Sequence, residues 1–166
     1  IPASLAQTTY ERILARLEGR DIRAVVDATR DLLVNVLRYK PFLIKPNNHE
    51  LSEIAGVKLT NDNEIVTAAR MMQAKGARNV LVSMAGDGAL LLDEQGGVHR
   101  IGCPKGKVVN SVGAGDSMVA GFVAGYQQSG GDYAAALKLG TACGSATAFS
   151  LGLATKADID KLLKTM

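Results

Sequence analysis

The sequence is poor in aromatic residues, in net charge and in cysteine. Aromatic side chains make up 4% of its 166 residues, and the formal net charge is only +3. Both values argue against a surface that stacks bases or attracts nucleic acid or membranes. Cys103 and Cys143 lie far apart and have no partner at metal-ligand spacing. We therefore predict two reduced thiols in a cytoplasmic protein.

Long apolar runs are also lacking. No run reaches the length of a membrane span, and residues 1–4 have neither the basic region nor the apolar stretch of a signal peptide. With 47% hydrophobic and 21% charged residues, the composition is that of a folded chain with one core. We expect a single domain over residues 1–166, with no nucleic-acid or membrane partner.

Short apolar runs alternate with helical patterns along the chain. This alternation predicts an α/β fold, with helices on both faces of a mixed, mainly parallel sheet. The methionines of the helix at 62–75, Met71 and Met72, are expected on its buried face with Ile65, Ala68 and Ala69. The predicted strands are 24–27, 42–45, 79–83, 89–93 and 98–101, and the predicted helices are 8–17, 31–37, 62–75, 117–128, 133–149 and 155–163.

A glycine-rich segment followed by a carboxylate is the most informative stretch. Gly113 and Gly115 allow a ligand to approach the backbone closely, and the helix beyond them would direct its amides and dipole at an anion. Asp116 lies among those amides, where a carboxylate binds anions poorly but suits a base. The pattern favours phosphoryl transfer to a hydroxyl, with Asp116 taking the proton. The alternative is a structural loop, with Asp116 as an ordinary first-turn residue.

Asn47 and Glu50 follow the predicted strand 42–45. The carboxyl end of a parallel strand is where an α/β sheet presents its ligand groups, and a carboxylate there suits a magnesium ion that keeps much of its water shell. The same spacing fits a capping box that only starts a helix. The residues alone leave both interpretations open.

Residues 110–123 resemble the C-terminal signature of the ribokinase-like (PfkB) carbohydrate kinases. In that family the Gly-Ala-Gly-Asp segment forms an anion hole and its aspartate is the catalytic base. The resemblance therefore implies anion-hole roles for Gly113, Ala114 and Gly115, and a catalytic role for Asp116.

Other parts of the chain share this resemblance. Lys-Pro-Asn-x-x-Glu at 45–50 is similar to a family motif that influences magnesium and phosphate binding, so Asn47 and Glu50 are assigned to the metal region. The segment with Ser83 and Gly86 resembles a family segment on the nucleotide side, but a plain hairpin turn explains its glycines equally well. The residues that the resemblance places near the nucleotide are Lys45, Ser83, Gly86, Ser111, Val112, Gly144 and Ser145.

The resemblance implies ATP-dependent phosphorylation of a sugar phosphate, with Mg²⁺. The expected acceptor is fructose 1-phosphate, which gives fructose 1,6-bisphosphate. Kinases of tagatose 6-phosphate or fructose 6-phosphate are alternatives within the family, and a nucleotide-binding module without catalysis is an alternative from another class. Only the C-terminal part of the family is matched. We thus expect a three-layer α/β/α sandwich of ribokinase-like type that lacks the N-terminal part and lid. We also expect this part to be inactive alone and to belong to an enzyme that can form a homodimer.

Overall fold

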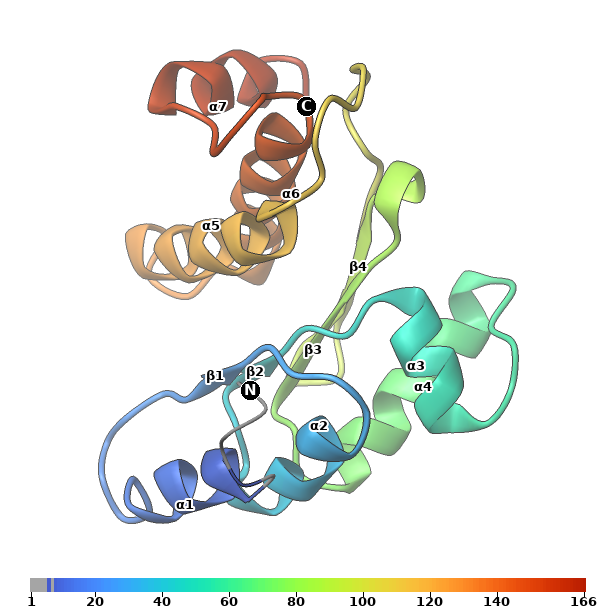
Figure 1. Cartoon of the computed structure of the whole chain (residues 1–166), viewed down its shortest axis with the longest axis vertical. Helices are drawn as coiled ribbons and strands as arrows, with labels where there is room; N and C mark the ends of the chain where they lie inside the picture. The colour runs from blue at the N-terminus through green and yellow to red at the C-terminus, as the bar shows by residue number, and fades with distance from the viewer. Residues whose placement is uncertain (1–5, 7) are drawn as a thin grey trace. The chain divides into compact units, whose positions relative to one another are not determined.

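The structure is a computed structural model that describes residue 6 and residues 8–166 (Figure 1). The chain divides into two compact units, one of residues 1–82 and 92–98 and the other of residues 83–91 and 99–166. The first unit contains α1 (Thr9–Ala15), β1 (Val25–Val26), α2 (Arg30–Val36), the 3₁₀ helix η1 (Leu37–Tyr39), β2 (Leu43–Ile44), α3 (Asn48–Ala55), α4 (Asp62–Ala74) and most of β3 (Asn79–Ser83). The second contains the 3₁₀ helix η2 (Ala85–Asp87), most of β4 (Ala89–Leu92) and of β5 (Val98–Ile101), α5 (Ala114–Gln128), α6 (Tyr133–Ala148) and α7 (Lys156–Leu163).

The five strands form one mixed sheet in the order β1-β2-β3-β4-β5. β1 pairs with β2, and β2 with β3, in parallel. Tight turns join the later strands: the Met84 amide donates to the Gly88 carbonyl (2.8 Å), and the Asp93 amide to the Gly97 carbonyl (2.9 Å). The predicted α/β class with a mixed sheet is confirmed.

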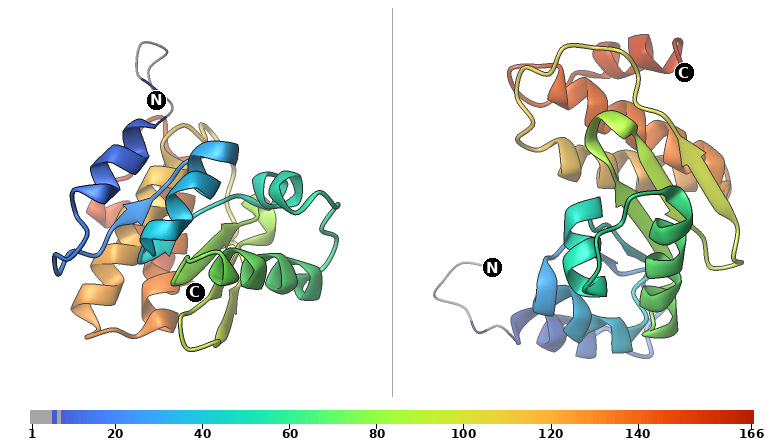
Figure 2. Two further views of the ribbon diagram at one scale, coloured as in Figure 1. Left: turned by 90° about the horizontal axis from the view of Figure 1, so that it is seen from below. Right: turned by 90° about the vertical axis from the view of Figure 1, so that its right-hand side faces the viewer.

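The first unit has its own apolar core. β2 contributes Leu43 and Ile44, both fully buried, as expected for a parallel strand covered on both faces. Asn79 is buried at the start of β3, where its side-chain amide donates to the Phe42 carbonyl (2.7 Å) and its carbonyl oxygen accepts from the Glu94 amide (2.9 Å). Helices α3 and α4 pack against each other (Figure 2).

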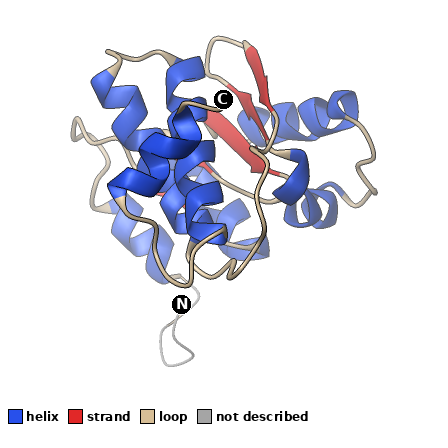
Figure 3. Cartoon of the chain, turned by 90° about the horizontal axis from the view of Figure 1, so that it is seen from above, coloured by secondary structure: helices blue, strands red, loops and turns tan. Residues whose placement is uncertain are grey.

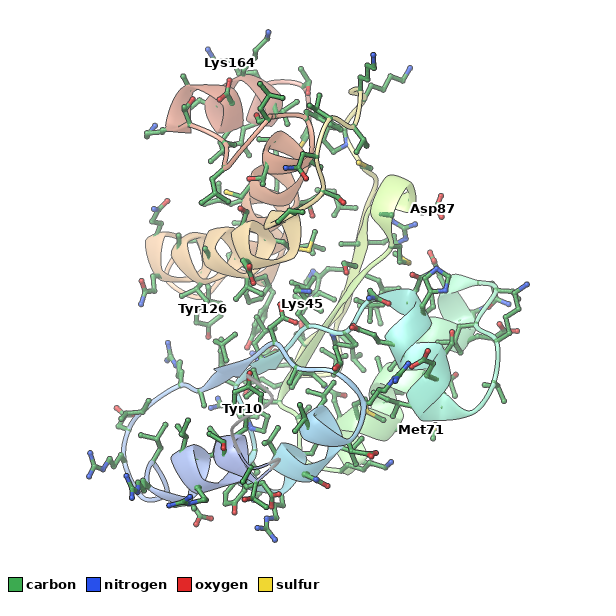
Figure 4. The ribbon with its side chains drawn as sticks, viewed as in Figure 1. Tyr10, Lys45, Met71, Asp87, Tyr126 and Lys164 are labelled. Carbon is green, nitrogen blue, oxygen red and sulfur yellow. The ribbon has the colours of Figure 1, made fainter. Side chains whose placement is uncertain are left out.

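The buried face of α4 is narrower than predicted. Ile65, Ala68, Ala69 and Met72 are buried, but the Met71 side chain is 43% exposed (Figure 4). The prediction for Met71 was wrong because 65, 68, 69 and 72 already complete one helical stripe, and position 71 lies beside it.

Two helices of the second unit, α5 and α6, pack against each other; the helices of the chain are blue in Figure 3. A β-carbon on Gly121 would lie 2.6 Å from Cys143 Sγ, and one on Gly140 would lie 2.9 Å from the Met118 carbonyl. Larger residues at these two positions would push the helices apart. Helix α5 begins at Ala114 rather than Ser117.

Both cysteines are free thiols, as predicted. Burial raises the pKa of the Cys143 thiol, which disfavours the reactive thiolate. Cys103 Sγ lies 3.7 Å from Ser145 Oγ. No helix in the described part of the chain has the length and hydropathy needed to cross a membrane.

Candidate active site

The start of α5 is shaped by Gly113. Its φ of +80° is left-handed, a conformation that glycine adopts at little cost. The Ala114 amide closes the preceding turn by donating to the Ser111 carbonyl (3.1 Å), and the Ser117 amide donates to the Gly113 carbonyl (2.9 Å). Gly113 therefore allows the chain to turn sharply into a helix at Ala114.

Two adjacent amides at this helix start have no acceptor among residue 6 and residues 8–166. Among the described residues, neither the Gly115 amide nor the Asp116 amide makes a hydrogen bond. The Ala114 amide, in contrast, is already bonded within the turn. Free amides at the positive end of a helix form a site for an anion.

The Asp116 carboxylate lies in the same first turn of α5. It is exposed, and it forms no hydrogen bond or ion pair with any residue that the structure describes. A structural N-terminal aspartate would normally accept from a nearby amide. An unpaired carboxylate beside free amides can instead accept a proton from a bound hydroxyl.

The loop before this turn is anchored to the end of α6. The amides of Val109 and Asn110 both donate to the Ala148 carbonyl (2.8 and 3.1 Å). The Asn110 side chain donates to the Leu151 carbonyl (3.1 Å) and accepts from the Val112 amide (3.0 Å). Asn110 thus positions Ser111 and Val112, which are exposed.

A buried threonine connects the same end of α6 to α5. Thr147 Oγ1 donates to Ser117 Oγ (2.9 Å) and accepts from the Ala154 amide (3.3 Å). Thr147 is 1% exposed. No local pattern predicted this role, because Thr147 and Ser117 are 30 positions apart along the chain.

Thr141, on the same helix, offers a test of how buried hydroxyls affect stability. Its Oγ1 is buried and has no hydrogen-bond partner within the described part of the chain. We expect Thr141→Val to raise the free energy of unfolding by about 1 kcal/mol, since an unpaired buried hydroxyl is destabilising and valine has the same shape. Urea denaturation measures the change.

Thr147→Val is the matched control for that substitution. It makes the same chemical change, but it removes the partner of both Ser117 and Ala154. We expect a loss of about 1–3 kcal/mol. If both variants lose stability equally, Thr141 has a partner in solution and the prediction is wrong.

Gly144 and Ser145 also lie on α6. A β-carbon on Gly144 would be 3.0 Å from the Ala114 carbonyl and 3.2 Å from Met118 Cβ, so this glycine lets α6 approach the start of α5. Ser145 is 8% exposed. Neighbouring protein atoms explain why Gly144 and Ser145 are small residues. That either residue contacts a nucleotide stays a prediction.

Ser83 and Gly86 lie at the end of β3 and in η2. A β-carbon on Gly86 would meet no atom within 4 Å, so packing does not explain this glycine. The neighbouring Ala85 has a left-handed φ of +46°, and Asp87 is exposed (Figure 4). The open surface at Gly86 is compatible with a ligand.

In the first unit, Asn47 and Glu50 form the capping box that starts α3. The Glu50 amide donates to Asn47 Oδ1, and the Asn47 amide donates to Glu50 Oε2, both at 2.8 Å. Glu50 Oε1 makes no hydrogen bond to a described residue. The described residues contain no group of three or more acidic, histidine or cysteine side chains around one point. The role of Asn47 and Glu50 near a magnesium ion stays a prediction.

Lys45 is buried at the end of β2 (Figure 4). Its Nζ lies 3.3 Å from Asp27 Oδ2. Sequence reasoning missed this pairing, although Asp27 and Lys45 are each the last residue of a predicted strand, which is the signal that could have found the pair.

Comparison with known proteins shows the family of the chain. Residues 1–160 match the family described as pfkB family carbohydrate kinase. The chain belongs to the pfkB family of carbohydrate kinases. This confirms the predicted family membership and the ribokinase-like fold class.

Two relatives with named activities are similar to this pfkB chain over nearly its whole length. A 1-phosphofructokinase of Bacillus subtilis is 45% identical over 163 residues, which cover 98% of this chain and 53% of the relative. A D-tagatose-1-phosphate kinase of Bacillus licheniformis is 39% identical over 166 residues, covering 99% and 53%. This pfkB chain therefore spans about half the length of the curated relatives it matches.

A solved structure has the same fold. Phosphofructokinase-2 from Escherichia coli, in complex with substrates and products, superimposes with a TM-score of 0.90 at 26% identity. The match covers 99% of this chain and 54% of the other.

Proposed function

We propose that this chain supplies the nucleotide-binding and catalytic-base part of an ATP-dependent sugar-phosphate kinase. The observation that carries the proposal is the unpaired Asp116 carboxylate beside the free amides of Gly115 and Asp116. In the proposed reaction, Asp116 takes the proton of the acceptor hydroxyl. The two amides stabilise negative charge on the phosphoryl group during its transfer from ATP.

ATP and Mg²⁺ are the proposed cofactors. Glu50 Oε1 is available to a magnesium-bound water, while the capping box holds the carboxylate in place. When bound, the metal neutralises charge on the phosphates. Gly113 and Ala114 shape the anion hole, and the proposed nucleotide contacts are Lys45, Ser83, Gly86, Ser111, Val112, Gly144 and Ser145.

The proposed acceptor is fructose 1-phosphate, and the proposed product is fructose 1,6-bisphosphate. The support is the 45% identity to a 1-phosphofructokinase. D-Tagatose 1-phosphate is a second candidate, because a relative with 39% identity is a D-tagatose-1-phosphate kinase. Both acceptors are ketose 1-phosphates, so a panel of sugar phosphates separates them from fructose 6-phosphate and tagatose 6-phosphate.

We expect this chain alone to bind ATP but to have almost no kinase activity. Its relatives are about twice as long, and bringing two reactants together requires groups that hold both. Calorimetric titration should show saturable ATP binding that is stronger than AMP binding. Turnover of each sugar phosphate should stay below about 1% of that of a full-length relative.

A full-length chimera tests the acceptor. It joins the N-terminal half of the Bacillus subtilis relative to this chain, and it should phosphorylate fructose 1-phosphate faster than any other sugar phosphate in the panel. A folded chimera that binds ATP but phosphorylates none of them would contradict the proposed function. Full activity of the chain alone would contradict its proposed dependence on a second half.

A further inference from the structure

Asp27 and Lys45 meet because of strand register. β1 and β2 are parallel, and Val26 lies opposite Ile44. The residues that follow, Asp27 and Lys45, therefore leave the two strands side by side, and Asp27 Oδ2 lies 3.3 Å from Lys45 Nζ. The pair lies at the carboxyl end of the strands, the end at which α/β sheets bind ligands.

Lys45 is buried to a degree that is unusual for lysine. Its side chain is 8% exposed, whereas that of Asp27 is 34% exposed. Removing an ammonium group from water is costly unless a charged partner compensates it. Asp27 is the only ion-pair partner of Lys45 in the described part of the chain. The carboxylate therefore fixes the end of an otherwise flexible side chain.

The ion pair leaves the ammonium group able to bind a second anion. Lysine has three N–H donors, and no hydrogen bond from Lys45 to any described residue is formed. Two residues further on, the capping box of Asn47 and Glu50 begins α3. The Lys45 ammonium group thus lies close in sequence to the proposed magnesium and phosphate region.

We propose that Asp27 is a positioning residue that holds the Lys45 ammonium group where it binds the phosphates of ATP. This inference rests on the proposed function, in which Lys45 contacts those phosphates. Asp27 acts through Lys45 and does not itself touch the nucleotide. Asp27 is negatively charged, so it also repels a phosphate directly. This repulsion weakens ATP binding, whereas the positioning of Lys45 strengthens it.

A double-mutant cycle separates these effects. Asp27→Asn, Lys45→Met and the double variant are titrated with ATP by calorimetry, in EDTA and again with Mg²⁺. Asp27→Asn should weaken ATP binding about tenfold in the wild-type background, and less than about twofold when Lys45 is already methionine. AMP affinity should not change, because AMP lacks the β- and γ-phosphates. Asp27→Glu should recover part of the loss.

Several results would overturn the inference. Tighter ATP binding by Asp27→Asn would mean that only charge repulsion was removed. An equal loss in both backgrounds would show that Asp27 does not act through Lys45. A loss seen only with Mg²⁺ would assign Asp27 to the metal.

Thermal unfolding of the same variants tests the pair without any ligand. Asp27→Asn should lower the Tm by several degrees in the wild-type background and by less than half as much beside Lys45→Met. Equal shifts would show that the ion pair does not form, and positioning would be excluded. If the Tm shifts differ between the two backgrounds but the wild-type chain binds no ATP, the proposed function fails. The ion pair of Asp27 and Lys45 is then only structural.

Discussion

Asp116→Asn should reduce the turnover of the full-length chimera by about a thousandfold. Proton removal by a positioned base contributes roughly 10²–10⁴ to a rate, and asparagine has nearly the same size but cannot take the proton. The carboxylate makes no hydrogen bond or ion pair with any described residue, so its loss should not unfold the chain. Steady-state kinetics with fructose 1-phosphate and ATP measure the effect.

ATP affinity distinguishes a base from a ligand-binding group. Asp116 lies in the same turn as the two free amides, where its charge opposes that of a phosphate. We therefore expect Asp116→Asn to bind ATP as tightly as the wild-type chain, or more tightly, while turnover falls. This split between binding and turnover is not expected of a purely structural loop.

Asp160→Asn is the matched control for Asp116. Asp160 is a half-exposed carboxylate on α7 whose only ion-pair partner among the described residues is Lys156, at the i,i+4 spacing, and such pairs contribute little. The same chemical change there should leave turnover and ATP affinity unaltered. If Asp116→Asn retains more than about a tenth of the wild-type turnover, the catalytic role of Asp116 is refuted.

Local patterns explain why most elements could be predicted from the sequence. The buried stripe of α4 follows the helical period, and the continuous apolar runs at β2 and β3 are typical of strands covered on both faces. The start of α5 could not be placed so well. Gly113 and Gly115 both suggested a loop, but only Gly113 has a left-handed backbone, and Gly115 already belongs to the helix.

The contacts that support the candidate site were the harder part to predict. Gly113 to Asp116 are contiguous, so their motif was visible in the sequence. Asn110 and Thr147 act through residues about 30–40 positions away, and no local pattern reports such contacts. Asp27 and Lys45 are an intermediate case, because their pairing follows once the register of two parallel strands is known.

Gly88→Ala should destabilise the protein more than any other alanine substitution proposed here. Gly88 closes the turn between β3 and β4 with φ of +92° and ψ of −132°, a region that is costly for residues with a side chain. A β-carbon there would lie 2.1 Å from the Ile101 carbonyl and 2.7 Å from the Cys103 amide nitrogen. Both are backbone atoms, so no side chain can move aside to relieve the contact.

The expected loss is about 3–5 kcal/mol, the sum of backbone strain and overpacking. Because natural domains are stable by only about 5–15 kcal/mol, the variant should be partly unfolded at 37 °C. Circular dichroism during urea and thermal denaturation measures this. The turn also carries Gly86, so ATP affinity should fall with the folded fraction.

Two other glycines of the same meander separate the causes. Gly96 has a similar φ of +88° but open space around it, so Gly96→Ala should cost only about 1 kcal/mol from backbone strain. Gly86 has neither a left-handed φ nor a neighbour within 4 Å. Gly86→Ala should be neutral or stabilising by up to about 1 kcal/mol, since alanine has fewer unfolded conformations. If Gly88→Ala costs no more than Gly96→Ala, the close approach of the 101–103 backbone to this turn is wrong.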